Sequence, residues 1–111
     1  MWSNLIVQGA AGSPANRLQH VAIYESSSNT MTIFGGSGAH MFLGDTWVLS
    51  HANGLGGTPV WTRLSASGPV PSGRYNNVGV DTVNNLMVMF GSGFQEGPLW
   101  STWVLTHPNG M

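Results

Sequence analysis

Apolar residues along the chain fall into short runs of four to six residues, separated by segments rich in Gly, Ser and Asn. Runs of this length are too short for typical helices, and no 3.6-residue periodicity links them. The separating segments consist of residue types that tolerate turns or positive φ. The pattern predicts antiparallel strands joined by turns. Four of these strands are Val21–Tyr24, Met31–Phe34, Thr46–Leu49 and Val60–Leu64.

Two apolar runs, Met31–Phe34 and Leu86–Phe90, lack the alternation of apolar and polar residues that a strand exposed on one face shows. We therefore expect both strands to be covered on both faces.

The chain repeats itself once, at an offset of 59 residues that shrinks to 56 after two small gaps. Trp2–Leu5 matches Trp61–Leu64, and Thr46–Leu49 matches Thr102–Leu105. Further matched pairs are Arg17 with Arg74, Asn29 with Asn85, His51 with His107, and Asn53 with Asn109. A period of this size indicates a tandem structural repeat. Each unit contains four strands, which we call A to D.

The strands run in the order D, then A-B-C-D, then A-B-C. Residues 1–8 contain the first D strand, residues 17–64 a complete unit, and residues 74–107 a unit without its D strand. A C strand with a bare edge presents unpaired backbone groups that another chain can pair with. We predict that one chain donates its first strand to another. The residues expected to make this contact are Trp2, Leu5, Trp103 and Leu105.

Several motifs resemble those of the kelch-repeat β-propeller family. The residues that carry the resemblance are Arg17 and His20, Ile33–Gly36, Leu43–Val48, and Trp61–Leu64. The resemblance implies an all-β fold with two four-stranded kelch-like blades per chain. The second unit departs from the pattern at Asn77, Ser92 and Ser101, which replace His20, Gly36 and Asp45.

Two blades are too few to close a ring, because propellers contain about 4–8 blades. The resemblance favours six or seven, and two per chain give even numbers only. We expect three chains to form a closed six-bladed propeller, a homotrimer; a tetramer with eight blades is the alternative. The contact is head-to-tail. A segment cut from a longer single-chain propeller is the other interpretation.

The resemblance also implies a ligand-binding face, formed by residues just before strand A and just after the glycines that end strand B. Its candidates are Arg17, Ser37, His40, Arg74, Ser92 and Phe94. Trp100, whose counterpart in the first unit is Gly44, is a further candidate beside the B–C loop. The repeated Arg17 and Arg74 are expected to bond backbone carbonyls or Asp45, since buried charges need partners. The tryptophans at matched strand positions are expected to pack in the core.

Charged residues make up only 6% of the chain, with net charge −1 and no Cys. Nucleic acid is not an expected partner, because phosphate binding needs clustered cations. No run of about 18 apolar residues predicts a membrane span. Four carboxylates and no Cys give little support for catalysis. The spacings of the four histidines match no zinc signature, and we expect no metal and no cofactor.

These patterns favour a self-assembling propeller scaffold or interaction module without catalytic chemistry, with a protein or glycan as possible ligand. The alternative is a carbohydrate-binding, lectin-like propeller, suggested by Phe94 and Trp100 in the loop 93–100.

Overall fold

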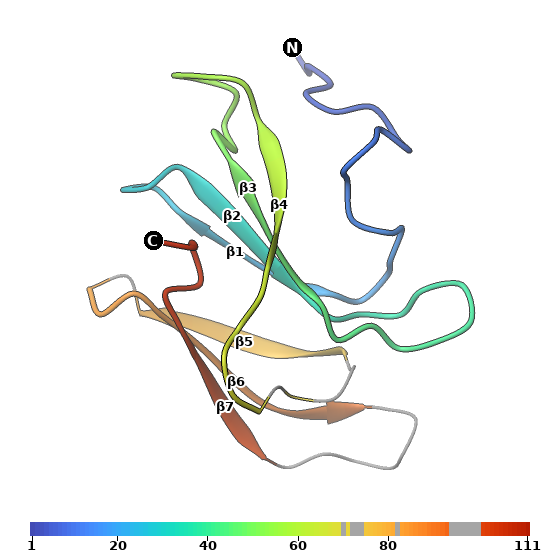
Figure 1. The fold of residues 1–111 in the computed structure, drawn as a ribbon, viewed down its shortest axis with the longest axis vertical. Helices are drawn as coiled ribbons and strands as arrows, with labels where there is room; N and C mark the ends of the chain where they lie inside the picture. Colours follow the sequence, from blue (N-terminus) through green and yellow to red (C-terminus); the bar gives the residue numbers. More distant parts are fainter. Residues whose placement is uncertain (70, 72–74, 82, 94–100) are drawn as a thin grey trace.

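The first repeat unit forms a four-stranded antiparallel sheet in the computed structural model. The structure describes residues 1–69, 71, 75–81, 83–93 and 101–111, with the backbone alone for 75–80 and 91–93. Each strand pairs with the next along the chain. The strands are β1 (Val21–Glu25), β2 (Thr30–Phe34), β3 (Thr46–Ser50) and β4 (Val60–Leu64) (Figure 1). The four predicted strands of this unit are thus confirmed.

The second unit forms a three-stranded antiparallel sheet in the order β5-β6-β7. Its strands are β5 (Tyr75–Asp81), β6 (Leu86–Gly93) and β7 (Thr102–Thr106). The register repeats that of the first sheet: Thr32 lies opposite Val48, and Val88 lies opposite Val104, each 56 residues further on. The fold is therefore all-β and built from two similar sheets.

The two sheets pack against each other through one face of each, with β1 and β5 adjacent. Phe34 of β2, with Val21 and Ile23 of β1, is buried against Met87 and Met89 of β6. Trp103 and Leu105 of β7 pack on the same cluster. A buried hydrogen bond of 2.7 Å, from Thr32 Oγ1 to the Pro108 carbonyl, joins the sheets at one end. Burial of apolar surface stabilises a fold by about 25 cal/mol per Å². The contact between the two sheets therefore forms the core of the chain.

The coverage of the two B strands differs. In β2 every residue except Met31 is buried, which confirms the expectation of cover on both faces. In β6, Met87 and Met89 are buried, but Phe90 on the other face is 54% exposed. The expectation is wrong for β6, because the first sheet covers only one of its faces.

Residues 1–16 contain no strand and lie along the first sheet, on its side away from the second sheet (Figure 1). A Cβ atom placed on Gly54 would lie 2.9 Å from Leu5 Cδ2, so this leucine sits on the turn after β3. Leu64, at the end of β4, lies in the same way against Gly110, in the turn after β7. Leu5 and Leu64 are equivalent in the repeat. The N-terminal segment therefore lies against the first sheet where β4 lies against the second.

Candidate functional site

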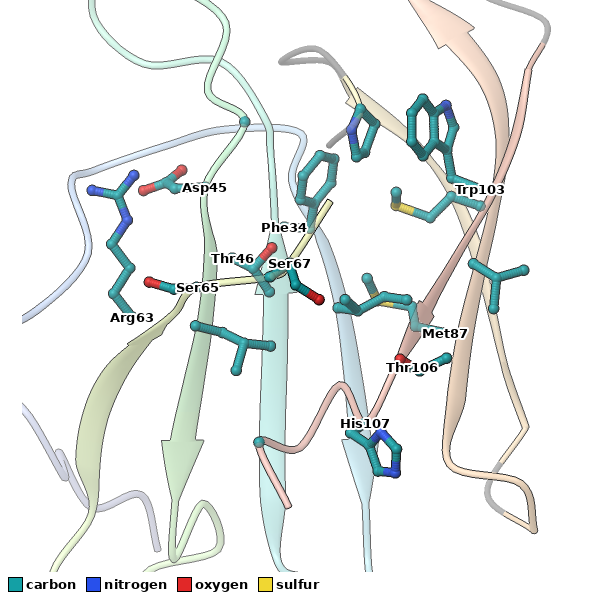
Figure 2. A pocket seen from close by; sticks show the side chains of 18 of the residues that line it. Phe34, Asp45, Thr46, Arg63, Ser65, Ser67, Met87, Trp103, Thr106 and His107 are labelled. Carbon is teal, nitrogen blue, oxygen red and sulfur yellow. The ribbon is translucent and has the colours of Figure 1, made fainter. Parts of the chain in front are cut away.

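A cleft of about 870 Å³ lies between the two sheets. One wall is the end of β4 with the loop that follows it, and the other is β7 with the turn that follows it. Figure 2 shows Phe34, Met87 and Trp103 directed into the space between the sheets. Hydroxyl groups line the cleft as well, from Ser65, Ser67, Thr46 and Thr106. The cleft therefore offers an apolar, aromatic interior with polar groups around it.

The titratable groups give the cleft little acid–base chemistry. Asp45 and Arg63 lie at its margin, apart from the aromatic interior (Figure 2). His107 is the histidine in its wall. Within the described part of the chain, no three His, Cys, Asp or Glu side chains come together as a metal site. The lining of the cleft thus combines an aromatic, apolar interior with the side chains of Asp45, Arg63 and His107.

Arg17 and Asp45 form a two-point ion pair beside the first sheet. The guanidinium donates to both carboxylate oxygens, at 2.7 and 3.0 Å, and the Arg17 side chain is 3% exposed. It also donates to the carbonyls of Gly35 and Ala15, both at 3.1 Å. The predicted partners of Arg17 are confirmed. This side chain connects the segment before β1 to the residue that follows β2 and to the residue that precedes β3.

The ion pair governs the protonation of Asp45. Hydrogen bonding from Arg17 lowers the pKa of this carboxyl to about 2, although partial burial opposes the change. The indole Nε1 of Trp47 donates to the same carboxylate at 2.7 Å and makes a smaller contribution to this lowering of the pKa. Partial burial and the nearby Arg17 charge lower the pKa of His20.

The second sheet replaces this carboxylate by a hydroxyl. Trp103, the counterpart of Trp47, donates its indole Nε1 to Ser101 Oγ at 3.0 Å. Ser101 occupies the repeat position of Asp45, so the indole keeps an acceptor without the charge. Trp103 is partly buried against the core, as expected for a tryptophan at a repeated strand position.

In each sheet an asparagine between the first two strands bonds to an asparagine in the turn after the third strand. Asn29 Nδ2 donates to Asn53 Oδ1 at 2.9 Å, and Asn85 Nδ2 donates to Asn109 Oδ1 at 3.0 Å. Asn29 and Asn85 have φ of 53° and 54°, a region that asparagine tolerates better than most residues. The sequence identified these four asparagines as matched positions but did not predict that they bond to each other. The signal was present, because all four positions match in the repeat.

The repeated histidines contribute to these turns through their backbone groups. His51 and His107 take φ of 49° and 52°, and their carbonyls accept hydrogen bonds from Gly54 and Gly110. The side-chain hydrogen bonds of the turns come from the asparagines instead, and the Nδ1 atom of His51 has no hydrogen-bond partner in the part of the structure that is described.

Three ligand-face candidates lie at one end of the first sheet. Ser37, through its backbone, forms isolated bridges with Leu18 and Phe42, which places it beside Arg17. His40 is exposed in the following turn. The Arg17 guanidinium is engaged by Asp45, so it is a fixed structural group at this end.

The other ligand-face candidates come from the second unit. Ser92 lies in β6, where the backbone alone is described. Arg74, Phe94 and Trp100 lie outside the described residues. The ligand face thus stays a prediction.

The assembly candidates are on the surface or beside the cleft. Trp2 is fully exposed and Leu5 is 47% exposed, in a segment without strand pairing. Trp103 and Leu105 lie on β7 and line the cleft. No strand pairs with the outer edge of β7 among the residues that the structure describes. In the first sheet the corresponding edge of β3 carries β4.

Comparison of the chain with protein-family models gave no match, and a search of curated proteins found no similar protein. In the ranges that the structure describes, no helix has the length and hydropathy of a membrane span.

Proposed function

We propose that the chain is a kelch-like β-propeller module that assembles with copies of itself by strand exchange and carries no catalytic chemistry of its own. The expected assembly is a ring of three chains and six blades. In this proposal each sheet is one blade, and the second blade is completed by residues 1–5 of the next chain.

The observation that carries the proposal is the edge of β7. It is equivalent to the edge of β3, which pairs along its whole length with β4. Residues 1–5 match β4 in position in the repeat and are identical to it at Trp2 and Leu5, but they have no strand pairing. An open strand edge and an unpaired segment from the repeat position of its missing neighbour are complementary. Pairing between chains satisfies the backbone groups of both.

The exposed outer face of the second sheet supports the same proposal. Val104 is 52% exposed, whereas Val48, at the equivalent position of the first sheet, is 7% exposed. Val48 lies directly opposite Thr32, whose hydroxyl bonds the Pro108 carbonyl, so Val48 faces the second sheet of its own chain. A following blade would cover Val104 in the same way, and removing apolar surface from water favours association.

Light scattering tests the proposal directly. Three chains of 11.8 kDa give about 35 kDa and four give about 47 kDa. We expect the larger species at micromolar concentration, and a chain shortened by residues 1–6 is expected to be monomeric. Circular dichroism controls for folding, because the removed residues contain no strand. A single-chain mass for the intact protein, with its strands retained, contradicts the proposal.

A carbohydrate-binding function is the second candidate, and the cleft is the observation that favours it. Trp103 and the hydroxyls of Ser65 and Thr106 line the same space. An aromatic face with hydrogen-bonding groups around it suits a sugar ring. Binding on a glycan array that is lost in a Ser65→Ala/Thr106→Ala double variant would support this candidate. A flat response across the array removes it.

A further inference from the structure

Trp2 differs from the other tryptophans that the structure describes. Its exposure is that of a free side chain, whereas Trp47, Trp61 and Trp103 are all partly buried. A fully exposed tryptophan costs free energy that burial would recover. Because Trp2 is equivalent to Trp61, the surroundings of Trp61 indicate which surface Trp2 would meet.

The pairing of β3 with β4 provides the register. Trp61 lies opposite Leu49, and Thr62 lies opposite Val48. The corresponding positions on β7 are Leu105 and Val104. A strand added to β7 in the same register places Trp2 opposite Leu105, and Ser3 opposite Val104.

The face on which the added Trp2 would lie follows from this register. Residues directly opposite each other in antiparallel strands point to the same side of the sheet. Leu105 points toward the first sheet, where it packs on the core cluster and lines the cleft. Trp2 of the added strand therefore points into the cleft as well.

We propose that Trp2 of a second copy occupies the cleft between the two sheets, with residues 1–5 of that copy paired to β7 in the register of β3 and β4. This inference rests on the proposed self-assembly and assigns its register and the occupant of the cleft. The cleft runs along β7 from Trp103 to His107, so an added strand closes its open side.

The position of Leu5 agrees with this docking. Leu5 rests on Gly54 of its own first sheet, as Leu64 rests on Gly110. Leu64 makes this contact while β4 is fully paired with β3. By the same geometry, Leu5 can keep its contact with Gly54 while its strand pairs with β7 of another chain. The segment is thus already held at the place from which it would reach a neighbouring copy.

Cysteine cross-linking tests the register, and the chain has no Cys of its own. Two single-cysteine variants, Ser3→Cys and Val104→Cys, are mixed in equal amounts, refolded together and oxidised. Directly opposite residues have Cβ atoms about 4.5–5.5 Å apart, close enough for a disulfide with slight adjustment. The matched controls combine Ser3→Cys with Thr102→Cys or Thr106→Cys, which keep the face of the strand but shift the register by two residues.

We expect the mixed disulfide dimer to form at least tenfold faster with Val104→Cys than with either control. Faster cross-linking at Thr102→Cys or Thr106→Cys, or none at all in a protein that still assembles, overturns the register while leaving self-assembly intact. A chain that stays monomeric in light scattering overturns both.

Substitution of Trp2 tests the occupant of the cleft. Because this side chain is fully exposed in the single chain, Trp2→Ala is expected to leave the fold intact but to weaken assembly at least tenfold. Val7→Ala, at another exposed apolar position, is the control and is expected to change assembly less than twofold. Equal effects of the two substitutions contradict the proposal.

Discussion

Arg17 holds Asp45 through both carboxylate oxygens and thereby joins a segment that precedes β1 to the start of β3. The two residues are 28 positions apart in the chain. The guanidinium also donates to the Gly35 carbonyl, at the end of β2. This one side chain thus connects three segments of the first unit. It is a structural group, although its position in the repeat also made it a candidate for ligand binding.

Replacing Arg17 by Met is expected to lower the free energy of unfolding by about 2 kcal/mol, because hydrogen bonds to charged groups contribute about 1.5–3 kcal/mol and Asp45 would remain partly buried. Arg63→Met is the control, since that arginine is exposed on β4, and it should change stability by less than about 0.5 kcal/mol. Urea unfolding at pH 7 and one protein concentration measures both. An equal decrease in the free energy of unfolding for the two variants would show that the ion pair does not stabilise the fold.

Asp45 is expected to give the fold a specific sensitivity to acid. Its pKa is about 2 in the folded chain against an ordinary value of 3.8. The unfolded chain therefore takes up this proton at higher pH than the folded one, so protonation favours unfolding. The contribution is complete above about pH 5 and is lost as the pH falls toward 2.

The measurement is urea unfolding across pH 2–6 for the original chain and for Asp45→Asn. The variant should be less stable at pH 6 and should lose less stability on acidification. Glu25 and Asp81, whose pKa values are also lowered by hydrogen bonds, remain in both proteins and supply the common slope. Parallel curves for the two proteins would contradict the assignment.

The asparagine pair of the first sheet separates backbone strain from side-chain hydrogen bonding. Asn29→Ala loses the bonds to Asn53 and the Leu55 carbonyl and places alanine at positive φ, so we expect a loss of about 2–3 kcal/mol. Asn29→Gly loses the same bonds but tolerates that φ. Thermal or urea unfolding should show glycine about 1 kcal/mol less damaging than alanine. If alanine is the better tolerated, strain at this position is negligible.

The proposed assembly predicts a polar contact between copies. Asn109 Nδ2 donates to Glu25 Oε2 at 2.8 Å within one chain. The equivalent residues are Asn53 and Asp81, which the proposed assembly brings together from two copies. Asn53→Asp keeps the acceptor used by Asn29 and Leu55 but places a carboxylate against Asp81 of the neighbour. We expect weaker assembly, about tenfold, with little change in the stability of the single chain.

Asn109→Asp is the matched variant for this contact. It places two carboxylates together inside one chain, so it should lower the stability of the chain itself. Light scattering and urea unfolding at low concentration separate the two effects. If Asn53→Asp destabilises the single chain as much as Asn109→Asp does, the result contradicts the contact between copies.

The strands could be predicted well from the sequence because the physics that places them is local. Apolar runs of strand length, bounded by Gly, Ser and Asn, have few other stable arrangements, and their recurrence identified the unit. The same recurrence indicated the partners of Arg17. The asparagine pairs were missed because a matched Asn in a turn has several uses, and its side-chain partner depends on how two distant turns meet.

What the sequence by itself determined, then, is the all-β repeat, its strands and the residues shared by both units. Only the tertiary structure decided which face of each sheet is buried: Met87 is covered by the first sheet, while Val104 on the opposite face stays open. The tertiary structure also decided that Leu5 lies on Gly54 and that a cleft lies beside β7. The reason is that strand formation follows from neighbouring residues, whereas the burial of a face depends on which other sheet packs against it.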